Sequence, residues 1–244
     1  MPIKLPNQLP AFDILKNKKV FVMDKDRAEH QDIRPLKIGL FNLMPTKEVT
    51  ETQIFRMIGN SPLQIEPILI RTESYTPKNT SQNYLNDFYK TFNEIKEEGL
   101  DGLIITGAPV EHLPFEEVAY WNELTKIMDW ANEYVCSTLH LCWAAQAGLF
   151  HHYEVPKYDL PAKMFGVFPH THKDSQTLLL RGMDDEFFVP HSRHTEIHAE
   201  DINKVKDLEI LSESEISGVY MVANKDRSSV FITGHPEYDR ETLS

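Results

Sequence analysis

The sequence STLHLCWAAQAGL at residues 137–149 decides the fold. Its first part is a short, mostly apolar run that predicts a buried β-strand, and WAAQAG predicts a helix that begins directly after Cys142. A strand that passes at once into a helix places the side chain between them at the carboxyl edge of the sheet, where open α/β folds bind ligands. We therefore expect Cys142 to stand at the ligand-binding edge of an α/β sheet.

The segments on either side repeat this strand-and-helix pattern. Strands are predicted at 37–43, 65–70 and 101–107, and helices at 46–59, 85–99 and 118–135. Apolar strands that alternate with helices are typical of a parallel sheet covered on both faces. After Pro156, short strand-like runs separated by turn residues indicate antiparallel pairing. We therefore expect a doubly wound, mostly parallel α/β sheet with antiparallel additions in the C-terminal half.

The domain organisation follows from composition along the chain. Residues 1–35 are polar and interrupted by prolines, which predicts an N-terminal arm rather than a first strand. Residues 36–244 contain no internal repeat and no linker rich in Gly or Ser, so we expect a single α/β domain there. A chain of 244 residues buries roughly 70–75% of the surface that its unfolded form exposes, which gives a sufficient core without disulfides.

The charge and cysteine counts exclude several classes of function. Asp and Glu number 37 against 25 Lys and Arg, and this net charge of −12 argues against a nucleic-acid partner. No run of about 18 apolar residues and no apolar signal-peptide core occur, so we expect a cytoplasmic protein with no membrane partner. The two cysteines, Cys136 and Cys142, match neither a CxxC motif nor a zinc knuckle, which excludes a disulfide scaffold.

The position of Cys142 also predicts its reactivity. The helix that follows points its N-terminal amides and the positive end of its dipole at the sulfur, which favours the nucleophilic thiolate. Cys136 begins the same predicted strand instead of ending it, so we interpret Cys136 as a packing residue.

A second motif, GHPEYD at 234–239, follows the strand-like run SVFIT. Gly234 lets the strand end sharply, and Pro236 stiffens the step between His235 and Glu237. A histidine oriented by a carboxylate can take a proton from a thiol or hydroxyl and return it to a leaving group. Because both motifs follow predicted strands, we expect Cys142, His235 and Glu237 to form a catalytic triad.

Five segments together carry a resemblance to a known family: IGLFNLMPTKEVTE (38–51), TGAPVEHLPFEEVAYW (106–121), HLCWAAQAGL (140–149), PHSRHTE (190–196) and GHPEYD (234–239). The sequence resembles the class I glutamine amidotransferase fold and, more closely and over essentially the whole chain, the homoserine O-acyltransferases of the MetA family. Glutaminases usually flank the cysteine with glycines, where this chain has His140 and Ala144. That difference favours the acyltransferase branch.

The resemblance implies a ping-pong acyl transfer from acyl-CoA to the γ-hydroxyl of L-homoserine, the first committed step of methionine biosynthesis. Cys142 would carry the acyl group as a thioester, His235 would move the protons and Glu237 would hold the imidazole. No cofactor is implied, because acetyl-CoA is the acyl-donor substrate. For the oxyanion hole, our candidates are the backbone amides of Trp143 and of Ala108 in the Gly107–Ala108 turn.

The resemblance also implies which residues select the substrates. A glutamate at the position of Glu111 goes with acetyl-CoA in similar sequences, and a small residue goes with succinyl-CoA. Lys163 and Ser192 fall at positions that bind homoserine. Arg193, beside Ser192, is a further candidate for a carboxylate clamp.

A metal site is not expected, although histidines recur at 170, 172, 191, 194 and 198. No cysteine joins these histidines at a spacing typical of zinc sites. A role as a helix cap is sufficient for the adjacent pair His151 and His152.

Three alternatives remain open from the sequence alone. The enzyme could use succinyl-CoA as its acyl donor, act as a glutaminase with the same triad, or keep the fold as a non-catalytic binding protein. The resemblance further implies a homodimer. Members of this family normally continue past GHPEYDRETL with an arginine that contacts homoserine, so this chain is expected to lack the usual C-terminal extension.

Overall fold

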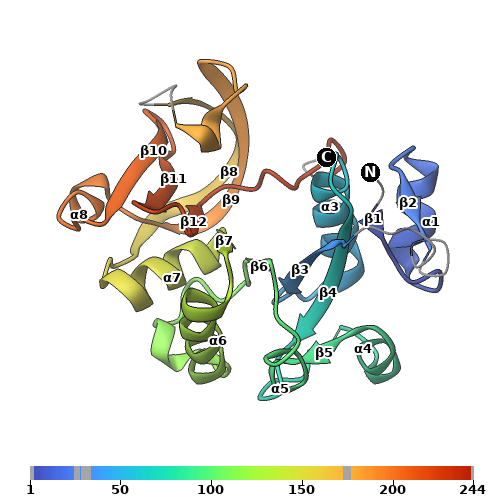
Figure 1. Ribbon diagram of the computed structural model, residues 1–244. Helices are drawn as coiled ribbons and strands as arrows, with labels where there is room; N and C mark the ends of the chain where they lie inside the picture. The colour runs from blue at the N-terminus through green and yellow to red at the C-terminus, as the bar shows by residue number, and fades with distance from the viewer. Residues whose placement is uncertain (1–2, 25–27, 29–33, 78, 173–176, 243–244) are drawn as a thin grey trace.

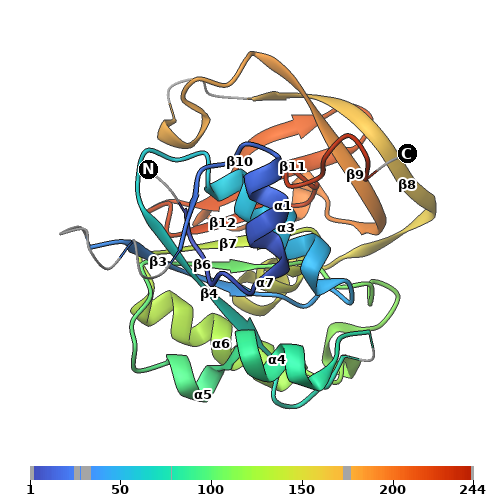
Figure 2. The ribbon, with the colours of Figure 1, turned by 90° about the vertical axis from the view of Figure 1, so that its right-hand side faces the viewer.

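A mixed β-sheet runs through the whole protein in the computed structural model, which describes residues 3–24, 28, 34–77, 79–172 and 177–242. Within these residues the sheet has 12 strands in the order β2-β1-β4-β3-β6-β7-β12-β11-β10-β8-β9, and β5 pairs with β4 (Figures 1 and 2). The strands are β1 (Ile3–Lys4), β2 (Val22–Met23), β3 (Leu36–Phe41), β4 (Ile65–Arg71), β5 (Lys90–Thr91), β6 (Gly102–Ile105), β7 (Ser137–Leu141), β8 (Tyr158–His172), β9 (Glu186–Glu196), β10 (Leu208–Ser214), β11 (Gly218–Asn224) and β12 (Ser229–Ile232). The helices are α1 (Pro10–Asn17), α3 (Lys47–Ile58), α4 (Gln82–Phe88), α5 (Phe92–Ile95), α6 (Trp121–Tyr134), α7 (Trp143–Tyr153) and α8 (Ala199–Ile202), with 3-10 turns η1 (Phe115–Glu117) and η2 (Leu178–Leu180).

The centre of the sheet is parallel, which confirms the predicted doubly wound α/β fold. Strands β4, β3, β6, β7 and β12 pair in that order and all run in the same direction. Since the carboxyl ends of parallel strands meet at one edge, the loops that follow β6, β7 and β12 come together there. These loops begin at Thr106, Cys142 and Thr233.

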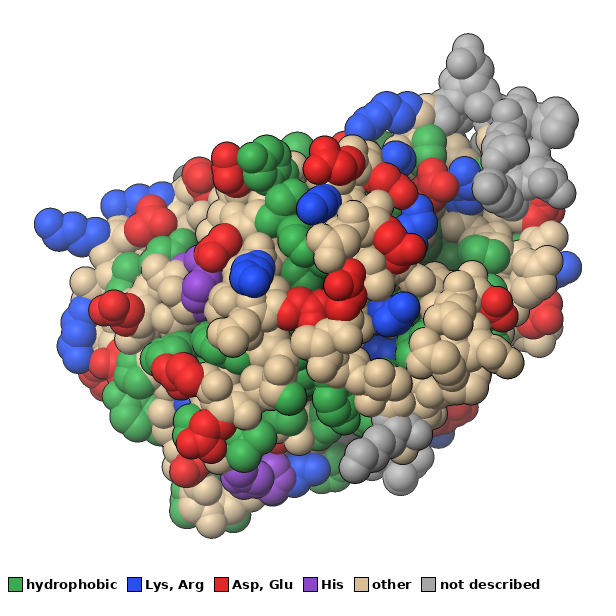
Figure 3. Space-filling model, turned by 90° about the horizontal axis from the view of Figure 1, so that it is seen from below, with side chains coloured by type: hydrophobic (Ala, Val, Ile, Leu, Met, Phe, Trp, Pro, Cys, Tyr) green, Lys and Arg blue, Asp and Glu red, His purple; other side chains and the backbone are tan. Residues whose placement is uncertain are grey.

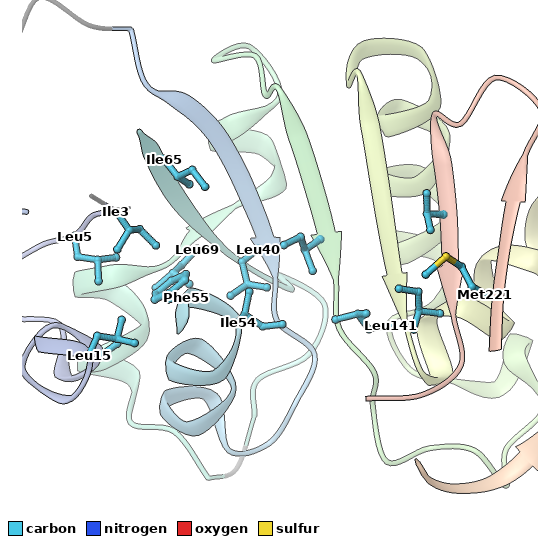
Figure 4. Close-up of a cluster of buried hydrophobic side chains, with 14 of the residues drawn as sticks. Ile3, Leu5, Leu15, Leu40, Ile54, Phe55, Ile65, Leu69, Leu141 and Met221 are labelled. Carbon is cyan, nitrogen blue, oxygen red and sulfur yellow. The ribbon is translucent and has the colours of Figure 1, made fainter. Parts of the chain in front are cut away.

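Helices cover both faces of this parallel centre. On one face α1 and α3 bury Leu15, Ile54 and Phe55 against Leu40 and Leu69 of the sheet (Figure 4). Each of these side chains is almost fully buried, and burial of one such side chain contributes roughly 1.5–3 kcal/mol.

The opposite face is covered by α6 and α7. Leu124 and Met128 of α6 pack with Trp143 of α7 and with Phe41 and Ile105 of the sheet. Figure 2 shows α1 and α3 on one side of the sheet and α5 and α6 on the other. The helix that follows Cys142 is therefore fixed inside the core.

The N-terminal segment differs from the predicted arm. Ile3 of β1 pairs with Ile65 of β4, so a short strand does form before residue 36, and Leu9 and Leu15 are buried in the core. The strand was missed because it has two residues, too few to produce a period-two pattern. Residues 1–2, 25–27 and 29–33 of the expected arm lie outside the described residues.

The helix predicted over 85–99 is wrong in its extent, because the chain breaks into α4, β5 and α5. Tyr89 adopts an extended conformation, and Thr91 then starts α5 with a capping box in which the Glu94 side chain accepts a hydrogen bond from the Thr91 amide at 2.6 Å. Between them β5 pairs with β4. Strand pairing and a new N-cap thus override the apolar spacing of the segment.

The C-terminal half is antiparallel, as predicted. Its longest hairpin, β8–β9, was predicted only in part, because β8 was not recognised as a strand. Strands β8 and β9 pair from Tyr158–Glu196 to Thr171–Glu186, and β10, β11 and β12 follow antiparallel to one another. Pro161 and Pro169 obscure β8 in the sequence, since proline is depleted in strands. The run LLLRGM, expected as a strand, forms the 3-10 turn η2 instead.

None of the helices formed by the described residues combines the length and the apolar character needed to cross a bilayer. On the face seen in Figure 3, acidic and basic side chains are interspersed with apolar ones.

Two buried histidines make the fold sensitive to acid. Burial lowers the pKa of His140 to about 3, where its ring stacks on Phe231 at 4.6 Å. Burial, together with the nearby charge of Arg193, lowers the pKa of His191 to about 2. The unfolded chain takes up protons at these residues below about pH 6.5 while the folded protein does not. Acid therefore favours unfolding.

We expect the free energy of unfolding to fall below about pH 6.5, by about 1.4 kcal/mol per pH unit for each buried neutral histidine. Urea titrations at several pH values measure this slope. The variant His140→Leu lacks one histidine that becomes protonated on unfolding. The slope of its free energy of unfolding against pH should therefore be shallower by about 1.4 kcal/mol per pH unit. Equal slopes in the two proteins would contradict the assignment of His140.

Candidate active site

Cys142 stands at a strained turn between β7 and α7. Its backbone has φ of 51° and ψ of −116°, a conformation that residues other than glycine rarely adopt. Its amide donates to the Ile232 carbonyl at 2.7 Å, and its carbonyl accepts from the Ala145 amide at 3.0 Å. The predicted strand-to-helix elbow is therefore present, with the cysteine at the N-cap of α7.

The loop after β6 lies against this cysteine. A Cβ atom placed on Gly107 would lie 3.1 Å from Cys142 Cβ and 3.6 Å from the Trp143 nitrogen, so the loop passes in close contact with the elbow. Ala108, the next residue, is buried. The loop and the first amide of α7 thus lie side by side, which is the arrangement that the predicted oxyanion hole of Trp143 and Ala108 requires.

His235 and Glu237 follow β12 at the same edge of the sheet. His235 Nδ1 lies 2.7 Å from Glu237 Oε1, and both side chains are buried. Burial alone lowers the pKa of His235, but the charges of Cys142 and Glu237 and the hydrogen bonds to both residues raise it to about 10. Because Nδ1 is occupied by Glu237, the hydrogen bond to Cys142 falls to Nε2. The structure thus brings the three predicted triad residues together.

The backbone around His235 fits closely against β9. The His235 amide donates to the Pro190 carbonyl at 2.9 Å. A Cβ atom on Gly234 would lie only 2.7 Å from Val189 Cγ1 and 3.1 Å from His191 Cε1, so this glycine permits the close approach.

A cation from α3 holds the segment that carries Glu237. The Arg56 guanidinium donates to the carbonyl of Glu237 at 2.8 Å and to that of Tyr238 at 3.2 Å, and it pairs with Asp239 at 3.3 Å. Lys18, just after α1, pairs with Asp239 at 3.1 Å. In Figure 1 the segment after β12 runs across to α3 near the C-terminal end of the described chain. The helices on one face of the sheet therefore position the loop that carries His235 and Glu237.

Ser192 and Arg193 point to opposite faces of β9. Ser192 pairs with Phe165 of β8 on the outer face, and Lys163 lies over the Phe165 ring with Nζ 5.2 Å from its centre. Lys163 and Ser192, the two residues expected to bind homoserine, thus share one face of the hairpin.

Arg193 does not share that face, which corrects its interpretation as a clamp beside Ser192. It is only 2% exposed, and its guanidinium donates to the carbonyls of Thr195, at 2.8 Å, and Ser217. Successive side chains of a strand alternate between faces, so Arg193 points into the core when Ser192 points out. Arg193 joins β9 to the turn before β11 and contributes positive charge below the site.

The loop that contains Glu111 is bound by Lys157, which precedes β8. Lys157 Nζ donates to the carbonyls of Glu111 and, at 2.6 Å, Leu113. The ring of His112 lies 4.6 Å from that of His194 on the outer face of β9. The Glu111 loop therefore borders the face that carries Ser192.

A polar cluster is buried at the start of α3. Lys47 Nζ donates to the Asn42 carbonyl at 2.5 Å, and burial lowers the pKa of Lys47 to about 8 although Glu51 opposes this shift. The Tyr84 and Tyr89 hydroxyls both donate to Glu51. The cluster fixes the turn between β3 and α3.

Two other expectations concern residues away from the triad. Cys136 is exposed rather than packed, because it lies just outside β7. Asp129, His151 and His152 could hold a metal ion at the far end of α7 from Cys142, and His151 Nε2 lies 2.6 Å from Asp129 Oδ1.

The comparisons with known proteins agree with this geometry. A family model described as homoserine O-succinyltransferase matches residues 2–244. The chain belongs to the homoserine O-succinyltransferase family. A homoserine O-acetyltransferase of Clostridium beijerinckii is 60% identical over 243 residues, which cover 100% of this chain and 80% of the relative. One from Brevibacillus brevis is 58% identical over 243 residues, covering 100% of this chain and 79% of the relative. Membership of this family makes the protein an acyltransferase.

Solved structures show the same fold at low identity. A glutamine amidotransferase of Thermotoga maritima has a TM-score of 0.58 at 11% identity and covers 84% of this chain and 77% of that chain. The glutaminase domain of Trypanosoma brucei CTPS has a TM-score of 0.54 at 11% identity, covering 84% of this chain and 87% of that chain. The predicted class I glutamine amidotransferase-like fold is confirmed.

Several residues that hold the site were missed from the sequence. Arg56, Lys157 and Lys18 act through backbone carbonyls or remote carboxylates, so no local motif marks them. Tyr238 lies inside the GHPEYD motif and could have been noticed there.

We expect Arg56→Ala to reduce kcat of the acyltransferase roughly ten- to hundredfold, because the loop that positions Glu237 loses its anchor. Steady-state kinetics with thermal unfolding as a folding check measure this effect. Arg227→Ala is a matched control, since Arg227 also binds a carbonyl and a carboxylate but lies at the turn between β11 and β12. An unchanged kcat in Arg56→Ala would show that the loop does not need this anchor.

Proposed function

We propose that the protein transfers an acetyl group from acetyl-CoA to the γ-hydroxyl of L-homoserine, a step of methionine biosynthesis. The observation that carries this proposal is the buried triad of Cys142, His235 and Glu237 at the elbow, in a chain of this family. The raised pKa of His235 supports a resting thiolate–imidazolium pair, which is the reactive form of a cysteine nucleophile.

The first half-reaction moves the acetyl group to the enzyme. The Cys142 thiolate attacks the thioester carbonyl of acetyl-CoA, and the amides of Trp143 and Ala108 stabilise the tetrahedral oxyanion. The bond between the carbonyl carbon and the CoA sulfur then breaks, and the His235 imidazolium gives its proton to the departing thiolate. One thioester replaces another, so the acetyl group stays activated.

The second half-reaction releases the product. The neutral His235 takes the γ-hydroxyl proton of homoserine while the hydroxyl oxygen attacks the acetyl carbonyl on Cys142. The bond to sulfur breaks, the Cys142 thiolate returns, and His235 is again an imidazolium held by Glu237. We assign homoserine to the face of the hairpin that carries Lys163 and Ser192, where a cation suits its carboxylate.

Glu111 supports acetyl-CoA over succinyl-CoA as the donor. Succinyl carries a carboxylate, and two like charges about 4 Å apart cost up to about 4 kcal/mol at an effective dielectric of about 20. Lys157 binds the backbone carbonyls of Glu111 and Leu113 and so fixes the course of the Glu111 loop, which supports this role. The names of the relatives, homoserine O-acetyltransferases, agree with this choice.

The site residues supply the acid, base and nucleophile of both steps, so we propose no cofactor and no metal in the reaction. From the family resemblance we also propose a homodimer that works in the cytoplasm.

We expect acetyl-CoA alone to add one acetyl group to Cys142, with no such adduct from succinyl-CoA and none in Cys142→Ala. Intact mass spectrometry after a short incubation detects the adduct. Cys136→Ala is the matched control, because that thiol is exposed and remote from His235. Ammonia release from glutamine without acetylation would instead favour the glutaminase alternative, which the structural neighbours support by fold alone.

We expect Glu111→Gly to gain use of succinyl-CoA, because the repulsion between two carboxylates is removed. The ratio of kcat/KM for the two donors should shift toward succinyl-CoA by at least about tenfold, which is 1.4 kcal/mol. Glu116→Gly, a change at another acidic residue nearby in the sequence, should leave the ratio unaltered. No gain with succinyl-CoA in Glu111→Gly would remove Glu111 as the specificity residue.

A further inference from the structure

Tyr238 lies flat against the catalytic histidine. The rings of Tyr238 and His235 have centroids 4.1 Å apart and planes 8° from parallel. The proposed chemistry gives this tyrosine no task, although it sits directly after Glu237. Its position against the base therefore needs its own explanation.

The stack is held in place by the backbone. The Tyr238 amide donates to the His235 carbonyl at 3.3 Å, and the Tyr238 carbonyl accepts from Arg56 at 3.2 Å. Because both contacts act on the main chain, they fix the ring without using its hydroxyl.

A parallel aromatic ring has a direct effect on a histidine that becomes charged. The face of a tyrosine ring carries negative electrostatic potential and attracts a cation within about 6 Å of its centre. His235 is an imidazolium in the resting pair and becomes one again when it takes the homoserine proton. The Tyr238 ring favours both of these states over the neutral imidazole.

Burial and the charges of Cys142 and Glu237 raise the pKa of Tyr238, so the residue stays a neutral phenol beside the histidine.

We propose that Tyr238 is a positioning residue whose ring stabilises the His235 imidazolium. The imidazolium itself rests on the mechanism proposed above, whereas the task of the ring does not depend on the identity of the acyl donor or acceptor.

The ring is tested by the pH dependence of Cys142 alkylation with iodoacetamide, in a Cys136→Ser background so that a single thiol reacts. Tyr238→Leu and Tyr238→Met should move the midpoint of this profile to higher pH by about half to one unit, because the imidazolium loses the aromatic face. Tyr238→Phe keeps the face and should match the parent protein. The leucine and methionine variants differ in side-chain shape, so if one of them fails to fold the other can still be measured. A parent-like midpoint in a folded non-aromatic variant would overturn this task.

Tyr153→Phe and Tyr153→Leu are matched controls. Tyr153 is a tyrosine at the other end of α7 whose hydroxyl donates to Asp207 at 3.4 Å. Both should leave the alkylation midpoint unaltered. If the parent protein is not acetylated by acetyl-CoA, the proposed function fails while the alkylation profile still decides the task of the ring.

Discussion

The proposed chemistry of this protein depends on a charged imidazole at a buried position. His235 is almost fully enclosed, and burial by itself favours its neutral form. Two partners reverse this preference through charge and hydrogen bonding: Cys142, and Glu237 with its oxygen 2.7 Å from Nδ1. An unpaired buried charge costs several kcal/mol, so loss of either partner would return His235 to the neutral state. The fold therefore has to hold all three groups together.

The parallel sheet meets this requirement because it brings the loops after β6, β7 and β12 to one edge. Cys142 takes its place at the elbow with a positive φ, a strain of about 1–3 kcal/mol that the buried helix α7 offsets through packing. The segment around Glu237 has no regular structure of its own, so Arg56 and Lys18 fasten it from α3 and α1. The packing of α7 thus positions Cys142, and the cations Arg56 and Lys18 position the segment that carries His235 and Glu237.

The parallel strands, the elbow at Cys142 and the catalytic loop could be predicted because each has a local pattern in the sequence. Strand β8 could not, since its prolines hide it and only pairing with β9 reveals it. The alternation of strand faces could have shown that Arg193 points away from Ser192, but only once β9 was assigned. Arg56 gives no signal at all, because its partners are backbone carbonyls about 180 residues away in the chain.

The protonation state of His235 in the free protein tests the central claim most directly. Nitrogen NMR of the labelled imidazole at neutral pH distinguishes an imidazolium, with two protonated nitrogens, from a neutral ring. We predict an imidazolium in the resting protein and a neutral ring in Cys142→Ala, where the thiolate is absent. A neutral His235 in the resting protein, at a pH where the protein is active, would contradict the account.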